Sequence, residues 1–218
     1  MSVLNSATRR LRRTRPPNRH ALVGPPKLWE MKRRFQFEFL HSRGLRTEHR
    51  LLDIGCGTLR GGIPLIEYLE IGHYTGIEAR GGVLDEGRKE LVEAGLEHKL
   101  PLLIRASDPA QVRLEDPVDF TWAFSVLFHM TDDIVDSYLA LVARALADSG
   151  AFYANVNLGD HEPDGWQGFP VLWRPESFYE RLASTHELVM SRVGSLGELG
   201  HNSGSVTQDQ QMMLRFTR

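Results

Sequence analysis

The feature that most constrains the fold of this chain is a glycine-rich turn between two apolar segments, "LLDIGCGTLRGG" at residues 51–62. The run "RLLDIG" that leads into the turn is typical of a buried strand. "RGGIPLIEYLE" after it is typical of a helix, in which Pro64 is tolerated only in the first turn. A strand, a glycine-rich turn and a helix in this order bring backbone N–H groups together at the N-terminus of the helix. The pattern therefore predicts a ligand-binding turn at the end of a strand.

The same alternation of short apolar runs and helix-like segments continues through most of the chain. Further strands are expected at residues 73–79, 100–106, 118–127 and 151–159, and a last pair at 186–194 and 209–218. Further helices are expected at residues 27–44, 82–95, 132–150 and 175–185. Strands that alternate with helices predict βαβ units, and therefore an α/β fold with a parallel sheet and helices on both faces.

Positive charge is concentrated at the N-terminus, although the net charge of the whole chain is −2. Residues 1–29 carry seven Arg and Lys residues and no Asp or Glu. We expect residues 1–26 to form a basic, flexible arm and residues 27–218 to form a single domain, because a chain of this length supports one core of ordinary size. A basic arm can also bind nucleic acid or an acidic surface, but this one lacks interleaved aromatic residues that would stack on bases.

The cysteine content and the hydropathy of the chain indicate its compartment. A single cysteine, Cys56, excludes an internal disulfide and a cysteine-based zinc cluster, and it fits a reducing compartment. No apolar run approaches the roughly 20 residues that span a bilayer, and the basic start is not followed by the apolar region of a signal peptide. We therefore expect a cytoplasmic protein without a membrane partner, either a monomer or a homodimer.

The residues of the turn discriminate between the ligands that such turns bind. A phosphate-binding P-loop would need Gly-Lys-Ser or Gly-Lys-Thr, which is absent here. A dinucleotide site would read G-x-G-x-x-G, but Arg60 stands where the third glycine belongs and the glycine is displaced to Gly61. Asp53 before the turn is electrostatically unfavourable beside a pyrophosphate. The same carboxylate suits a cofactor that is cationic at this end and carries no phosphate.

The turn Asp53-Ile54-Gly55-Cys56-Gly57 resembles the glycine-rich motif of class I S-adenosylmethionine-dependent methyltransferases. S-adenosylmethionine carries an ammonium and a sulfonium and no phosphate, which matches the preference of the turn. The resemblance extends over residues 48–158 and implies a Rossmann-like fold. That fold has a mostly parallel seven-stranded sheet, helices on both faces and an antiparallel last strand.

The resemblance also implies how the cofactor is bound. Glu78, at the end of the second strand, is expected to accept hydrogen bonds from both ribose hydroxyls, although a similar acid serves NAD enzymes and leaves a nicotinamide-dependent oxidoreductase as an alternative. Ser107 and Asp108 are expected beside the adenine, with Asp108 as a plain turn residue the alternative. Cys56 is expected to be a small filler and not a nucleophile. The full predicted set is Asp53, Gly55, Cys56, Gly57, Thr58, Glu78, Ser107, Asp108 and Ser125, and a cation at Lys32 or Arg33 is expected to hold the methionine carboxylate.

The residues after the fourth strand narrow the acceptor chemistry. The exit Phe124-Ser125-Val126-Leu127 lacks the Asn/Asp-Pro-Pro-Tyr/Phe motif of enzymes that methylate exocyclic base nitrogens. It also lacks the paired glutamates of protein-arginine methyltransferases. His129 lies just beyond, at the sheet edge where open parallel sheets place their reactions, and can accept a hydroxyl proton near neutral pH. We expect His129 as general base and Asp132 as a second catalytic residue; the alternative is that His129 only hydrogen-bonds the loop backbone.

Two loops, at residues 159–175 and 194–206, are expected to border the acceptor. The predicted substrate-binding residues are Asp160, His161, Trp166, Trp173, Glu198 and His201, and aromatic planes among them suit the apolar faces of a sugar or pack the loop onto the sheet. A Mg²⁺-type ion is a further candidate cofactor. Its ligands would come from Asp132, Asp133, Asp160, His161, Asp164 and His201, whose spacing is not diagnostic.

The lead-in "KLWEMKRRFQFEFL" and "DIGCGTLRGG" are similar to segments of bacterial carbohydrate O-methyltransferases. This resemblance implies that the acceptor is a hydroxyl of a sugar or oligosaccharide, such as the 1-hydroxyl of a 3-O-methylated mannoside. Two alternatives are kept. One is a nucleic-acid (RNA) methyltransferase that uses the arginine-rich arm to hold phosphates, although the acidic body of the chain argues against it, and the other is an O-methyltransferase of another small natural product.

Overall fold

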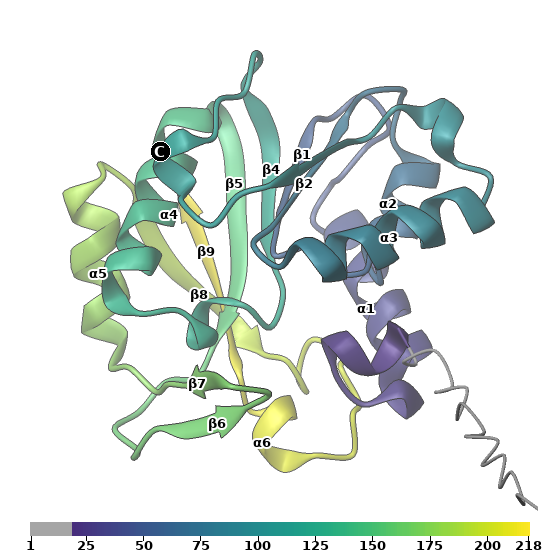
Figure 1. Ribbon diagram of the computed structural model, residues 1–218. Helices are drawn as coiled ribbons and strands as arrows, with labels where there is room; N and C mark the ends of the chain where they lie inside the picture. The colour runs from purple at the N-terminus through teal and green to yellow at the C-terminus, as the bar shows by residue number, and fades with distance from the viewer. Residues whose placement is uncertain (1–18) are drawn as a thin grey trace, which may run out of the picture.

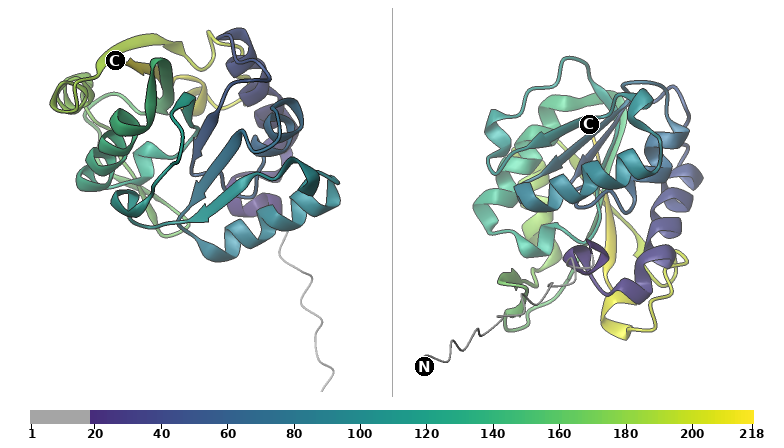
Figure 2. Two further views of the ribbon diagram at one scale, coloured as in Figure 1. Left: turned by 90° about the horizontal axis from the view of Figure 1, so that it is seen from above. Right: turned by 45° about the vertical axis from the view of Figure 1, so that its right-hand side comes forward.

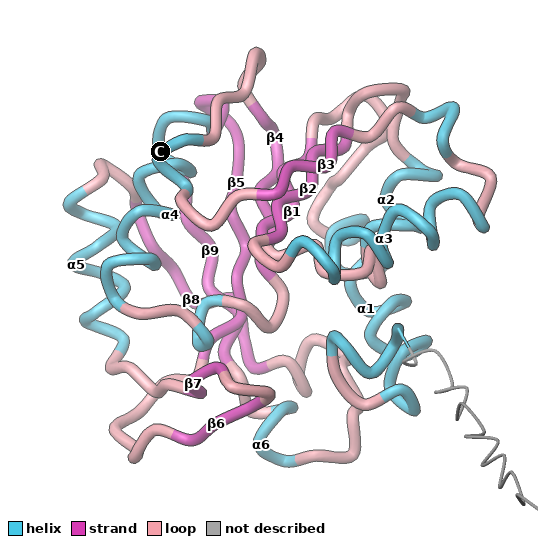
Figure 3. The backbone as a smooth tube through the Cα atoms, in the orientation of Figure 1, coloured by secondary structure: helices cyan, strands magenta, loops and turns pink. Residues whose placement is uncertain are grey.

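The computed structural model describes residues 19–218, so most of the expected N-terminal arm, residues 1–18, lies outside the described residues. A seven-stranded sheet runs through the centre of the molecule in the order β3-β2-β1-β4-β5-β9-β8 (Figures 1 and 3). Only β9 runs antiparallel to its neighbours in this sheet. The strands are β1 (Leu51–Ile54), β2 (Tyr74–Glu78), β3 (Leu102–Arg105), β4 (Val118–Ala123), β5 (Leu146–Val156), β8 (Val189–Ser195) and β9 (Met212–Thr217). The predicted Rossmann-like fold with an antiparallel last strand is confirmed.

Helices cover both faces of the sheet, as the end-on view in Figure 2 shows. The helices α1 (Trp29–Ser42), α2 (Gly62–Tyr68) and α3 (Gly81–Glu93) lie on one face, and α4 (Asp132–Ala145) and α5 (Glu176–Thr185) lie on the other. The core is accordingly divided in two. Phe39 of α1 and Trp122 of β4 belong to the first apolar cluster, and Leu139 of α4 and Phe152 of β5 belong to the second. Successive strand residues thus alternate between two buried faces, which explains why the central strands are apolar throughout.

Three short elements border the carboxyl edge of the sheet. The hairpin β6 (Asp164–Trp166) and β7 (Phe169–Val171) and the short helix α6 (Val206–Asp209) lie below this edge in Figure 1. A 3-10 turn, η1 (Arg19–Val23), lies against α3. Arg19 of this turn forms ion pairs with Glu86 and Glu90 of α3. The remaining 3-10 turns are η2 (Pro26–Leu28), η3 (Glu97–Lys99), η4 (Pro109–Gln111) and η5 (Leu127–His129).

The structure corrects three boundaries. The helix expected at residues 132–150 ends at Ala145, and β5 begins at once with Leu146, which pairs with Val118 of β4 before the register shifts so that Phe120 pairs with Ala151. The segment 159–175, expected to be irregular, contains the β6–β7 hairpin. Residues 19–26, expected to be flexible, instead form η1 and the approach to η2. Within residues 19–218, no helix is both long enough and apolar enough to cross a membrane.

Candidate active site

A cavity of about 280 Å³ opens at the carboxyl edge of the sheet, where β1, β2 and β4 end. The glycine-rich turn forms one wall of it through Gly55 and Gly57, whose φ angles are +71° and +60°. A Cβ atom at Gly55 would lie 2.5 Å from the side chain of Val126, and one at Gly57 would lie 2.8 Å from the side chain of Val23. Both positions therefore require glycine, for its backbone freedom and for close approach.

Asp53, the penultimate residue of β1, lies beneath this turn and is almost fully buried. The Tyr74 hydroxyl of β2 donates a 2.6 Å hydrogen bond to Asp53 Oδ2. Burial raises the pKa of Asp53 to about 7, while the hydrogen bond from Tyr74 opposes this rise. A buried carboxylate with this pKa gains from a cationic ligand, which restores the charge compensation that water no longer supplies.

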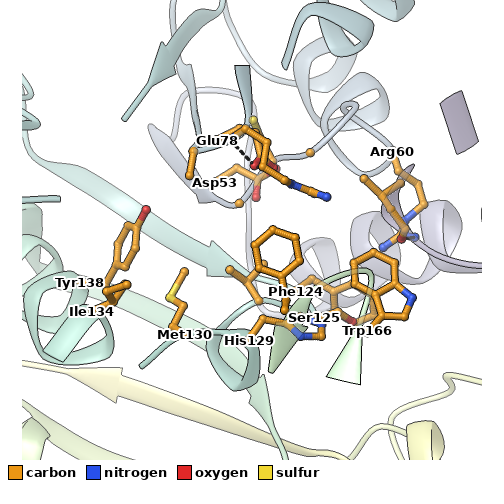
Figure 4. A pocket seen from close by; sticks show the side chains of 18 of the residues that line it. Asp53, Arg60, Glu78, Phe124, Ser125, His129, Met130, Ile134, Tyr138 and Trp166 are labelled. Carbon is orange, nitrogen blue, oxygen red and sulfur yellow. Dashed lines mark hydrogen bonds and ion pairs between the residues drawn. The ribbon is translucent and has the colours of Figure 1, made fainter. Parts of the chain in front are cut away.

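Glu78 ends β2 and faces the same cavity, as Figure 4 shows. Its carboxylate Oε1 accepts hydrogen bonds from the backbone N–H of Arg80, at 2.9 Å, and from Arg80 Nε, at 3.2 Å. Glu78 is 6% exposed, so these bonds hold the carboxylate in one orientation. The acid at the end of the second strand is thus oriented toward the ligand space.

One end of the cavity is basic. Arg60 is buried, lines the cavity, and donates a 2.8 Å hydrogen bond from one guanidinium nitrogen to the Val23 carbonyl, while its Nε has no partner. Lys32 of α1 is also buried, and the Lys32 ammonium lies 5.9 Å from the centre of the Phe124 ring. Burial lowers the pKa of Arg60 to about 10 and, aided by the charge of Arg60, the pKa of Lys32 to about 7. Two buried cations with an unpartnered donor suit an anionic group of the ligand.

Of these two cations, Lys32 was expected from the sequence and Arg60 was not. Arg60 occupies the position where a dinucleotide motif carries its third glycine. The departure from that motif was the available signal for it. Neither Lys32 nor Arg33, the other expected cation, lines the cavity.

The opposite end of the cavity is apolar, and Figure 4 shows Met130, Ile134 and Tyr138 there, away from Arg60. Ser107 also lines the cavity, as expected for an adenine neighbour. Asp108 does not; its carboxylate accepts a 2.9 Å hydrogen bond from the Ala110 N–H and caps η4. Asp108 thus caps η4 at the edge of the site, and its role beside the adenine stays a prediction. Ile134 and Tyr138 could not be predicted as site residues from the sequence, because their helical spacing resembles that of ordinary core residues.

His129 lies on the floor of the cavity beside the hairpin. Its Nδ1 lies 2.8 Å from the carbonyl oxygen of Pro170 in β7. Because a carbonyl only accepts, Nδ1 carries the proton, and the neutral ring presents an unprotonated Nε2. Burial lowers the pKa of His129, which favours this neutral form. His129 thus hydrogen-bonds the loop backbone, as the alternative interpretation expected. It also has the neutral protonation state that a general base needs.

Aromatic side chains from the hairpin complete this wall. The rings of Trp166 and Phe169 lie 5.4 Å and 6.4 Å from the His129 ring, measured between centres. Ser125, with a φ angle of +60°, lies next to them on the loop after β4, and its N–H donates a 2.7 Å hydrogen bond to the buried Asn155 side chain. Trp166 is therefore one predicted substrate residue that the structure brings to the cavity.

The remaining predicted catalytic and acceptor residues lie outside the cavity lining. The Asp132 carboxylate pairs with Arg174 Nε at 2.8 Å, and this pairing holds the buried Arg174 against the loop after β4. His161 packs on Trp173, and Glu198 accepts hydrogen bonds from Ser195. His201 is buried behind Phe124 with its Nδ1 2.7 Å from Asp209; Asp160 is exposed.

Two members of the predicted cofactor set, Cys56 and Thr58, are buried in the protein core. Cys56 lines the cavity but is buried, and burial raises the pKa of its thiol, so it is a poor nucleophile, as expected. Thr58 is fully buried and does not line the cavity. Among residues 19–218, no group of three or more His, Cys, Asp or Glu side chains gathers in the manner of a metal site.

The geometry of the cavity fits S-adenosylmethionine. The glycine-rich turn, Asp53 and Glu78 line the cavity together, with Asp53 where the cationic end belongs and Glu78 one strand further along. Arg60 lies at the end where a carboxylate is expected, and the apolar end suits a purine ring.

Comparisons with known proteins agree with this fit. Residues 52–152 match the family model described as a methyltransferase domain. No curated protein sequence matches the chain. Among solved structures, the CcbJ methyltransferase from Streptomyces caelestis is similar with a TM-score of 0.67 and 14% identity, over 89% of this chain and 96% of that chain.

Two further solved structures carry the cofactor. The magnesium protoporphyrin IX methyltransferase of Synechocystis PCC 6803 with bound S-adenosylmethionine has a TM-score of 0.61 and 14% identity, over 86% of this chain and 80% of that chain. The glycopeptide N-methyltransferase MtfA in complex with S-adenosylmethionine has a TM-score of 0.63 and 14% identity, over 84% and 92%. At these identities the likeness concerns the fold. Residues 52–152 therefore match a methyltransferase domain, and the chain as a whole shares the fold of S-adenosylmethionine-dependent methyltransferases.

Proposed function

We propose that the enzyme transfers the methyl group to a hydroxyl of a sugar or oligosaccharide, with His129 as general base. The single observation that carries this proposal is the hydrogen bond between His129 Nδ1 and the Pro170 carbonyl. It fixes the tautomer in which Nε2 can accept a proton, at the edge of the sheet where the cavity opens. A hydroxyl is a weak acid, so a positioned base speeds its reaction by roughly 10²- to 10⁴-fold.

The cofactor supplies a methyl group on a sulfonium, and the chain holds it from several sides. In our proposal Asp53 faces the cationic end, Glu78 accepts from the ribose hydroxyls, and Arg60 and Lys32 neutralise the methionine carboxylate. Ser107 lies beside the adenine. The acceptor oxygen forms its bond to the methyl carbon as the sulfur–methyl bond breaks, and His129 Nε2 takes the hydroxyl proton. Alignment of the two reactants supplies a large part of the rate.

The aromatic wall supports a sugar acceptor. Trp166 and Phe169 line the cavity beside His129. Apolar faces of pyranose rings stack on such planes, and the polar rim of the sugar remains available for hydrogen bonds. The 1-hydroxyl of a 3-O-methylated mannoside, as in the mycobacterial methylmannose polysaccharide methyltransferase, is the narrowest form of the proposal and follows from sequence resemblance alone.

One of the arginines that the nucleic-acid alternative needs for phosphate binding, Arg19, is paired with acidic residues of the protein. Arg19 lies in ion pairs with Glu86, Glu90 and Glu93 of α3, so its charge is already compensated. The other arginines expected to hold phosphates lie within residues 1–18, outside the described residues. We accordingly propose a small-molecule or oligosaccharide acceptor and a cytoplasmic location. We also propose that residues 27–218 form the enzymatic unit, to which residues 19–26 add the turn η1.

An acceptor screen with methyl-labelled S-adenosylmethionine tests this proposal. The panel contains mannosides and other oligosaccharides, phenols, primary amines and RNA, each with Mg²⁺ and with a chelator. We expect label on a sugar oxygen, located by mass spectrometry of the product and lost when the hydroxyl is removed. Label on an amine or on RNA, with none on any hydroxyl, would contradict it; MtfA, a glycopeptide N-methyltransferase, shows that this fold is compatible with nitrogen acceptors.

A further inference from the structure

We propose that Arg80 is a positioning residue that couples occupancy of the ribose acid Glu78 to closure of two chain segments over the cavity. The segments are η1 (Arg19–Val23) and the β6–β7 hairpin (Asp164–Val171). The inference rests on the proposed ribose-binding role of Glu78. It goes further by assigning a task to a residue that lies beyond the cofactor motif.

A single guanidinium reaches all three parts. Arg80 Nε donates to Glu78 Oε1 at 3.2 Å, and one terminal nitrogen donates to the Leu22 carbonyl of η1 at 3.2 Å. The guanidinium carbon lies 5.3 Å from the centre of the Phe169 ring in the hairpin. The Arg80 side chain is 30% exposed, so it sits at the rim of the cavity, between its interior and solvent.

The contacts of η1 show what this arrangement holds in place. Three successive carbonyls of η1 each accept a hydrogen bond from a different wall of the cavity. Gln167 of the hairpin turn donates to Ala21, Arg80 donates to Leu22, and Arg60 donates to Val23. Val23 itself lines the cavity beside Gly57. In our proposal, η1 moves aside as the cofactor enters and returns to enclose it.

Arg80 is the member of these three donors that also contacts Glu78. Both of its hydrogen bonds to that carboxylate use Oε1, so Oε2 is the oxygen that a ribose hydroxyl can reach. A ribose diol bound at Oε2 fixes the rotamer of Glu78. The fixed carboxylate in turn fixes the orientation of the Arg80 guanidinium. A planar guanidinium has five N–H donors and can serve a carboxylate, a carbonyl and an aromatic face together. A lysine ammonium at the same place has the charge but not this geometry.

Hydrogen–deuterium exchange with S-adenosylhomocysteine as the probe tests the coupling. Exchange is followed in peptides covering residues 19–24, 164–172 and 55–61, with and without saturating probe. The variants are Arg80→Ala, Arg80→Lys and the matched control Gln167→Ala, which removes a contact between η1 and the hairpin but leaves Glu78 and Arg80 intact. Probe affinity is measured for each protein by calorimetry.

In the wild type, we expect the probe to slow exchange in all three peptides. In Arg80→Ala and Arg80→Lys, affinity should fall by about tenfold, the 55–61 peptide should keep its protection, and the other two should exchange as in the free protein. Gln167→Ala should retain probe-dependent protection everywhere. Glu78→Gln, with Arg80 unchanged, should lose the same protection as the Arg80 variants, which guards against a folding defect in those variants.

Two results would overturn the proposal in distinguishable ways. If Arg80→Ala binds the probe and protects residues 19–24 and 164–172 as the wild type does, the coupling is wrong while the cofactor site stands. If the wild-type protein shows neither heat nor protection with the probe, the proposed cofactor roles and the coupling fail together.

Discussion

Tyr74 donates a 2.6 Å hydrogen bond to Asp53, and this pair lies directly beneath the glycine-rich turn. The bond stabilises the ionised form of a carboxylate that burial would otherwise keep neutral. We predict that Tyr74→Phe weakens S-adenosylmethionine binding by about tenfold at pH 7, equivalent to about 1.4 kcal/mol for a lost hydrogen bond to a charged group. Calorimetry measures it. Tyr68→Phe, which removes a hydroxyl bonded to the Leu45 carbonyl, is the control and should leave affinity unchanged.

The raised pKa of Asp53 predicts a stability that depends on pH. Asp53 has a pKa of about 7 in the folded protein and 3.8 as its ordinary value, so between these values the folded state binds more protons than the unfolded state. The contribution of this group to stability is therefore present below about pH 4 and is lost as the pH rises to 7. Its upper limit is about 4 kcal/mol.

Urea unfolding of wild type and Asp53→Asn between pH 4 and 7 measures this contribution. The stability of the wild type relative to the variant should decline with rising pH over that window. A difference that is constant with pH would show that Asp53 titrates in the folded state as it does in water. Lys32 acts above the window, because its lowered pKa of about 7 makes stability increase with pH from 7 toward 10.5.

His129→Gln should lower turnover by about 10²-fold or more while S-adenosylhomocysteine affinity changes less than threefold, because only proton removal from the acceptor is lost. Since burial lowers the pKa of His129, the wild-type rate should persist to a pH below the ordinary value of 6.5 before it falls. Steady-state rates against pH with the acceptor found in the screen give both results. His161→Gln, which alters a histidine outside the cavity, should change neither quantity.

Glu78→Ala should weaken S-adenosylmethionine binding by about 10- to 100-fold, since two hydrogen bonds from the ribose hydroxyls to a charged acceptor are lost. Fluorescence or calorimetric titration measures the affinity. Asp85→Ala, which removes an exposed acid of α3 paired with Arg88, is the control for a general change of charge. Equal affinity in Glu78→Ala and the wild type would remove Glu78 from the ribose site.

Asp132→Ala should act on stability and not on the chemical step. Its carboxylate compensates the buried Arg174 and lies in the first turn of α4, where a negative charge is favourable. We expect a loss of about 1–2 kcal/mol in the free energy of unfolding, with turnover per folded molecule unchanged. Denaturant titration and a rate corrected for folded protein separate the two. A lower corrected rate at full stability would restore Asp132 to the catalytic residues.

Most of the sheet and the cofactor-facing strand ends could be predicted because their signals are local. The strand β1 and the glycine-rich turn are adjacent in the chain, and Glu78 lies at the end of an apolar run. Ser107, two residues after the end of β3, was predicted by the same reasoning. The predicted helix at 132–150 failed at its end, since propensity does not reveal that β5 pairs from Leu146 onward.

The sequence by itself determined the alternation of strands and helices, the glycine-rich turn and the acids near the ends of β1 and β2, since each depends on neighbours within a few residues. The tertiary structure alone decided that Arg80 meets Leu22 across 58 positions and that Gln167 meets Ala21 across 146. It also decided that Asp132 serves Arg174 and that Trp166 reaches His129. The physical reason is that side-chain partners at such separations are chosen by how the packed layers bring distant segments together, which no local periodicity encodes.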